Sequence, residues 1–82
     1  MERTEIEEKL KVVFSDLFDE SIENINAATS PDTLEKWDSL AHIKLINALE
    51  ECFEIVVPPE DQAEILTFEL AADVVGDLRK QS

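Results

Sequence analysis

The stretch "SLAHIKLINALEECF", residues 39–53, constrains the fold of this chain more than any other segment. Its apolar residues recur every three or four positions, which is the spacing of one face of an α-helix. This helix should be the most buried one in the chain, because so broad an apolar face must be covered by other elements. We predict a helix from Ser39 to Phe53 with an apolar stripe of Leu40, Ile43, Ile46, Leu49 and Phe53, widened by Leu45, Ala48 and Cys52.

Two other long segments show helical periodicity. The first opens with Thr4 and Glu7, a capping-box pair, and its predicted apolar face comprises Ile6, Leu10, Val13, Phe14 and Leu17. The last helix should begin at a Thr67 cap and contains Gly76, the only glycine. Its predicted apolar side comprises Leu70, Ala71, Val74, Val75 and Leu78.

Prolines and polar residues mark the connections between these helices. Pro58 and Pro59 end the central helix, and a short helix from about Glu60 to Ile65 should follow them. Residues 20–36 are rich in Asn, Ser, Thr and Asp and should form a long loop. No segment alternates convincingly like a strand. We therefore predict an all-α fold in a single domain, 1–82: a small four-helix bundle with a long loop between helices one and two and a short third helix.

The charge and composition exclude several classes of protein. Twenty acidic residues against seven basic ones give a net charge of −13, which repels phosphate backbones and anionic lipid headgroups. Nucleic acid is therefore not an expected partner. No apolar run approaches the roughly 20 residues of a membrane span, and the first ten residues do not read as a secretory signal. The single Cys52 cannot form an internal disulfide, which is typical of a reducing compartment. We expect a cytoplasmic protein that does not insert into membranes and is a monomer.

Candidate catalytic and metal-binding residues are few. His42 and Cys52 are ten positions apart on one predicted helix, about 15 Å along its axis, so they cannot form a nucleophile–base pair. Two acidic clusters lack the spaced ligands and central glycine of a calcium loop and are interpreted as solvated helix faces. Their members are Asp16, Asp19 and Glu20 in one, and Glu60, Asp61 and Glu64 in the other. The sequence thus predicts neither a catalytic residue nor a resident metal, and no enzyme.

Asp38 and Ser39 stand at the start of the central helix, where two roles are open to them. Either side chain could cap the helix by accepting a hydrogen bond from a free backbone N–H group. Alternatively, the Ser39 hydroxyl could be a covalent attachment point, because a phosphate there would meet free N–H groups and the positive end of the helix dipole. Spacing alone does not separate the two roles.

The segments "TEIEEKLKVVFSDLF", "DSL" and "ALEECFEIVVPPEDQAEILTFELAADVV" together resemble the acyl carrier proteins over nearly the whole chain. The resemblance implies that a phosphopantetheinyl transferase attaches a 4'-phosphopantetheine arm from coenzyme A to Ser39. Asp38 would help to hold a magnesium ion and the coenzyme during that transfer. Acyl intermediates of lipid or fatty acid biosynthesis would then be carried as thioesters. Their chains would lie between the second and third helices, against Leu49, Val57, Ile65 and Ala71.

The resemblance also implies partners, namely acyl-loading and acyl-transferring enzymes with basic docking surfaces. The expected contact residues are Leu40, Ala41, His42, Lys44, Glu50 and Glu51. Ala41 and Lys44 stand where the common fatty-acid pattern is acidic, and Lys36 and Trp37 replace small residues before the serine. The string "EKWDSL" therefore resembles free-standing carriers of specialised acyl or polyketide-type pathways. Trp37 itself should pack the loop against the bundle, because a large aromatic side chain gains most from burial.

Two alternatives to an acyl carrier stay open at this point. The chain could carry an aminoacyl or peptidyl group on the same arm. It could also be an acidic helical interaction module without a prosthetic group, in which Ser39 only caps its helix.

Overall fold

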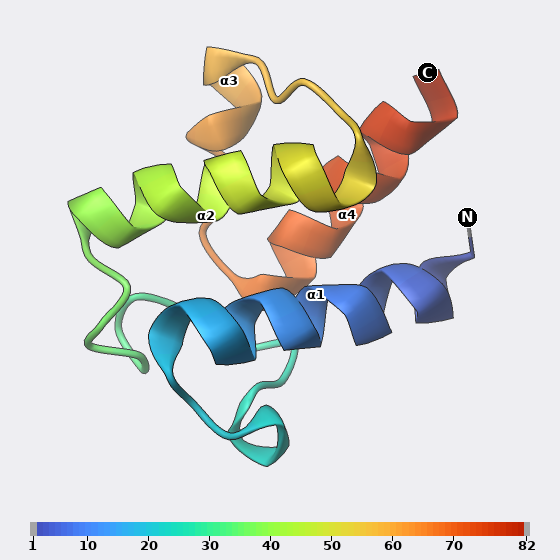
Figure 1. The fold of residues 1–82 in the computed structure, drawn as a ribbon. Coiled ribbons are helices and arrows are strands. Elements are labelled where there is room, and N and C mark those ends of the chain that lie inside the picture. The colour runs from blue at the N-terminus through green and yellow to red at the C-terminus, as the bar shows by residue number, and fades with distance from the viewer. Residues whose placement is uncertain (1, 82) are drawn as a thin grey trace.

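The computed structural model describes residues 2–81, and every regular element in that range is helical (Figure 1). Along the chain these elements are α1 (Arg3–Phe18), the 3₁₀ turn η1 (Ile22–Asn24), α2 (Ser39–Phe53), α3 (Pro59–Gln62) and α4 (Phe68–Gln81). The three long helices contact one another in pairs, while α3 lies above α2 in Figure 1. The predicted all-α class, with four helices, a long loop between the first two and a short third helix, is confirmed.

The predicted helix ends are right for α2 and partly wrong elsewhere. α1 begins at Arg3 after an extended Glu2, so Thr4 lies inside the helix and the predicted capping box is wrong. Glu7 bonds to the Arg3 side chain instead, at 2.9 Å. α3 spans Pro59–Gln62 instead of the predicted Glu60 to Ile65. It begins at Pro59 because proline suits the first helical position. It ends before Ile65, whose side chain is buried in the core.

The core is organised around aromatic side chains from three segments. Phe14 of α1 is fully buried, and its ring centroid lies 5.5 Å from Phe18, 5.3 Å from Trp37 and 5.3 Å from Phe68. The edge-to-face contacts with Trp37 and Phe68 are favourable arrangements for aromatic rings. Trp37 is only 3% exposed, which confirms that it packs the long loop against the bundle.

The apolar stripe predicted for α2 is wrong in its first half. Leu45, Ile46, Leu49 and Phe53 are buried, whereas Leu40 and Ile43 are 63% and 60% exposed. A step of three residues falls about 60° short of a full turn at 3.6 residues per turn. The series Leu40, Ile43, Ile46, Leu49 therefore winds halfway around the helix, and its first two members face away from the core.

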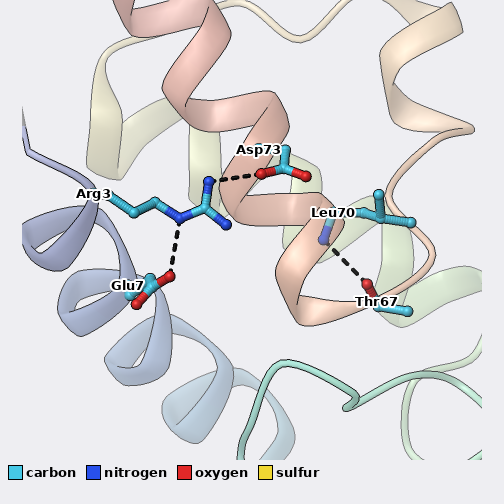
Figure 2. A network of polar contacts seen from close by, with 5 residues as sticks. All are labelled: Arg3, Glu7, Thr67, Leu70 and Asp73. Carbon is cyan, nitrogen blue, oxygen red and sulfur yellow. Dashed lines mark hydrogen bonds and ion pairs between the residues drawn. The ribbon is translucent and has the colours of Figure 1, made fainter.

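The long loop before α2 holds the start of α4. The N–H groups of Phe68 and Glu69 donate to the carbonyl oxygens of Thr29 (2.8 Å) and Ala27 (3.2 Å). The next N–H group along α4, that of Leu70, donates to the hydroxyl of Thr67 at 3.1 Å (Figure 2). This bond confirms the predicted Thr67 cap, and the three bonds satisfy N–H groups that a helix start leaves open.

The beginning of the same loop folds into the η1 turn. Ile25 is buried and holds the loop against the bundle, whereas Ile22 is 47% exposed. Glu20 accepts a hydrogen bond from the Asn24 amide at 2.8 Å and another from the Ser21 N–H group. These bonds stabilise the carboxylate and lower the pKa of Glu20 below its ordinary value.

Side-chain bonds link α4 to the other two long helices. Arg3 donates to Asp73 at 2.6 Å and to Glu7 at 2.9 Å, and these carboxylates raise the pKa of Arg3 (Figure 2). Because these groups are about half exposed, the network contributes little to stability. Arg79 donates to the carbonyl oxygen of Phe53, at the end of α2.

Gly76 lies within α4 and does not have a positive φ, so the helix continues through it.

Candidate functional site

The start of α2 assigns Asp38 and Ser39 different roles. Asp38 is the N-cap residue, and its Oδ1 accepts a hydrogen bond from the N–H of Ala41 at 2.8 Å. Ser39 is the first residue of the helix and is exposed. Within residues 2–81 no group forms a hydrogen bond with its hydroxyl. The capping role that the sequence left open therefore falls to Asp38, and the Ser39 hydroxyl faces solvent.

The hydrogen bond of the Asp38 cap should contribute to the stability of the protein. We expect Asp38→Ala to lower the free energy of unfolding by about 1 kcal/mol, because the Ala41 N–H group then loses its partner. Asp38→Asn should retain most of the stability, since asparagine caps as well as aspartate does. Urea unfolding followed by circular dichroism measures both. Equal loss in the two variants would mean that the charge of Asp38, and not its hydrogen bond, stabilises the helix.

A depression of about 510 Å³ opens beside Ser39. Its walls come from the loop before α2, the first turn of α2 and the segment from α3 to α4. The lining residues are Pro31, Trp37, Asp38, Ser39, His42, Gln62, Ala63, Ile65 and Leu66. Another depression, of about 370 Å³, lies over the long loop near Glu20 and includes no predicted site residue. The space beside Ser39 is therefore the one relevant to a group attached there.

The six expected docking residues differ in their exposure. Leu40, Lys44 and Glu51 are exposed, while Ala41 and His42 are half-buried. Glu50 is also half-buried, and its Oε2 accepts a hydrogen bond from the N–H of Val57 at 3.0 Å. Glu50 thus fixes the segment after α2. Ile43, which the sequence analysis placed in the buried stripe, is exposed like Leu40 three residues before it.

His42 lies in an internal network that sequence reasoning did not identify. Its Nδ1 accepts the indole N–H of Trp37 at 3.0 Å, and its Nε2 lies 3.0 Å from the carbonyl oxygen of Gln62. Both contacts are satisfied when the ring is neutral and carries its proton on Nε2. The rings of Trp37 and His42 are also stacked, with an interplanar angle of 16°. The only sequence signal was an aromatic residue five positions before a histidine.

The four residues expected to line an acyl-chain pocket are core residues. Leu49, Val57, Ile65 and Ala71 are each at most 2% exposed. Ile65 is the only one that lines the depression beside Ser39. The depression and the other three residues thus do not belong to one cavity.

Residues 2–81 contain neither a metal-binding cluster nor a membrane-spanning helix. Among the described residues, no cluster of three or more His, Cys, Asp or Glu side chains is arranged to hold a metal ion. None of the helices in that range combines the length and apolar character needed to cross a bilayer. Cys52 is exposed and has a free thiol.

Comparison with known proteins decides the family. No family model matches the chain. It is 32% identical over 77 residues to the acyl carrier protein of Buchnera aphidicola subsp. Schizaphis graminum (strain Sg), an alignment that covers 93% of this chain and 96% of that protein. The chain belongs to the acyl carrier protein family. Acyl carrier proteins act as carriers and not as enzymes, and the family works with acyl-handling enzymes.

The prosthetic group of acyl carrier proteins, 4'-phosphopantetheine, fits the start of α2. Ser39 presents an exposed hydroxyl at the first helical position. Within the described residues, the N–H groups of Ser39 and Leu40 donate to no protein acceptor. Free N–H groups and the positive end of the helix dipole both favour a phosphodiester. The residues that would hold the group are therefore Ser39 and the first turn of α2.

Proposed function

We propose that this protein carries acyl groups as thioesters on a 4'-phosphopantetheine arm attached to Ser39. The observation that carries the proposal is that Asp38 caps α2 and that the exposed hydroxyl of Ser39 has no hydrogen-bond partner among residues 2–81. The arm, when attached, supplies the thiol that forms the thioester, so the chain itself needs no catalytic residue. In the attachment, Ser39 Oγ loses its proton and gains a bond to phosphorus, and the adenosine bisphosphate portion of coenzyme A leaves.

Asp38 has a second part in this proposal. Its Oδ1 is occupied by the N–H group of Ala41, and the residue is exposed beside Ser39. The remaining carboxylate oxygen would contact the magnesium ion and coenzyme A held by the transferase, since hard cations prefer oxygen ligands. Asp38 therefore orients the helix start and also faces the enzyme that modifies its neighbour.

The surface around Ser39 supports brief docking to acyl-handling enzymes. Leu40 and Ile43 are large apolar residues that are more than half exposed, and they are followed along α2 by the exposed Lys44 and Glu51. The net charge of −13 attracts basic surfaces and speeds encounter without requiring high affinity. We propose a cytoplasmic monomer that meets one partner enzyme at a time.

Attachment of the arm is the test of the proposed function. Incubation with coenzyme A, magnesium and a broad-specificity phosphopantetheinyl transferase should add the mass of one arm, read by intact-mass spectrometry. A known acyl carrier protein in a parallel reaction shows that the transferase is active. An unchanged mass beside a modified control would remove the carrier function and favour an interaction module without a prosthetic group.

We also propose that the pathway served is specialised, of the acyl or polyketide type. The support is that Ala41 and Lys44 stand near Ser39 where the common fatty-acid pattern is acidic, so Lys44 would repel a basic enzyme surface. The double change Ala41→Asp, Lys44→Glu should make the loaded carrier a better substrate for a fatty-acid ketosynthase, mainly through faster association.

Salt dependence distinguishes charge from other effects of that double change. The advantage of the double variant should shrink as ionic strength rises, because salt screens exposed charges over about 10 Å at 0.1 M. The matched control is Asn47→Asp, an exposed charge change two turns from Ser39 on the same helix. Equal rates for the double variant and the unchanged carrier at low salt would mean that these charges do not set partner choice.

A further inference from the structure

Three residues form a continuous hydrogen-bonded connection next to Ser39. The indole N–H of Trp37 donates to Nδ1 of His42, and Nε2 of His42 contacts the carbonyl oxygen of Gln62, each at 3.0 Å. We call this connection the Trp37–His42–Gln62 bridge. It joins the loop before α2, the first turn of α2 and the end of α3.

The bridge is fixed at both of its ends. Trp37 is 3% exposed, and its ring packs against Phe14 and Phe18 of the core. At the other end, the Gln62 side chain donates to the carbonyl oxygen of Val57 at 2.9 Å, while its backbone carbonyl faces His42. Movement of α3 away from α2 therefore requires the contact between His42 Nε2 and the carbonyl oxygen of Gln62 to break.

Along α2, His42 lies between Ser39 and the core residue Leu49. It follows Ser39 by three residues, about one turn. It precedes Leu49 by seven residues, which places Leu49 about two turns further along the same face. All three bridge residues line the depression beside Ser39, whereas Leu49, Val57 and Ala71 do not. The depression therefore reaches Ile65 but stops short of those three core residues.

The walls of the depression select a particular chemistry. The ring nitrogens of His42 and the indole N–H of Trp37 are already paired with one another and with Gln62. The remaining walls are the apolar residues Pro31, Ala63, Ile65 and Leu66, together with Asp38 and Ser39, whose free polar groups lie at the attachment point. Away from Ser39 the surface therefore provides mainly apolar contact, which suits a small apolar ligand.

We propose that the Trp37–His42–Gln62 bridge makes this carrier selective for short apolar acyl groups, which occupy the depression beside Ser39, and keeps long alkyl chains out of the core. The proposal rests on attachment of the arm to Ser39. A long chain reaches Leu49 and Ala71 only when the contact between His42 and Gln62 opens. His42 is thus a specificity-determining residue and not a catalytic one.

The test compares two acyl lengths on the same protein by nuclear magnetic resonance. A promiscuous transferase attaches either the butyryl or the decanoyl form of the arm, and intact mass verifies each product. In the unchanged protein, both groups should shift the signals of Ala63 and Leu66, and neither should shift the methyl signals of Leu49 and Ala71. In His42→Ala, the decanoyl group should shift Leu49 and Ala71, and it should raise the melting temperature above that of the butyryl form.

Two other variants separate the bridge from simple loss of packing. Trp37→Phe keeps an aromatic ring but removes the indole N–H, so it should also let the decanoyl group reach Leu49. Asn47→Ala, an exposed change on α2, should behave as the unchanged protein.

The possible failures are distinct. Decanoyl-dependent shifts of Leu49 and Ala71 in the unchanged protein, as large as in His42→Ala, would overturn the bridge proposal and leave the carrier function standing. Absence of any mass gain would overturn both, because the bridge proposal depends on the arm.

Discussion

Ser39→Ala should abolish attachment of the phosphopantetheine arm completely. The hydroxyl oxygen of Ser39 is the atom that would bond to phosphorus, and alanine has no group to replace it. The helix should be unaffected, because Asp38 and not Ser39 provides the cap of α2 and because the Ser39 side chain is exposed. Intact-mass spectrometry after incubation with transferase should show no gain, while circular dichroism and the melting temperature stay as in the unchanged protein.

Ser21→Ala provides the matched control for this result. Ser21 is another exposed serine, and it lies next to a short helical turn rather than at the start of a long helix. This variant should accept one arm at the same rate as the unchanged protein. Modification of Ser39→Ala, or loss of modification in Ser21→Ala, would place the attachment point elsewhere in the chain.

Phe14→Ala should cause the largest loss of stability of any change considered. The ring of Phe14 is fully buried and contacts three other aromatic rings, from α1, the long loop and the start of α4. Removal of a buried aromatic side chain costs about 3–5 kcal/mol, because contacts are lost and a cavity remains. That loss is a large part of the 5–15 kcal/mol typical of a folded domain. Denaturant unfolding of the two proteins gives the difference directly.

Val12→Ala is the control for Phe14→Ala. Val12 lies on the same helix two positions earlier but is 49% exposed, so its truncation should change the unfolding free energy by no more than about 0.5 kcal/mol. Phe14→Leu should fall between the two variants, because leucine fills part of the volume. A loss below 1 kcal/mol for Phe14→Ala would mean that the neighbouring rings close the space.

The helical architecture was predictable because local signals agreed with tertiary structure. Asp38 before the apolar pattern and Pro58 after it bound α2, and the structure places its ends at Ser39 and Phe53 as predicted. Burial was harder to predict. Leu40 and Ile43 are apolar like core residues, but their angular position on the helix puts them at the surface. The prediction counted apolar residues at a spacing of three and therefore assigned these two to the wrong face.

Only the part of the candidate site that lies in one short stretch of sequence was predictable. Ser39 and Asp38 are neighbours in sequence, so a local motif could identify them. The role of His42 depends on Gln62, which is twenty residues away in the sequence and lies near His42 because α3 lies over α2 (Figure 1). Similarly, the bond from Val57 to Glu50 turned an expected surface acid inward. Contacts of this kind depend on the path of the chain and leave no periodic signal.

The bonds between the long loop and the start of α4 join segments that are about forty residues apart in the chain. Closing a loop of that length has an entropic cost that only the packed bundle offsets. We therefore expect these two hydrogen bonds, from Phe68 to Thr29 and from Glu69 to Ala27, to form and break together with the bundle as a whole. In amide hydrogen exchange, this loop and the first turn of α4 should consequently behave as one cooperative unit, although the loop contains no regular element beyond the short η1 turn.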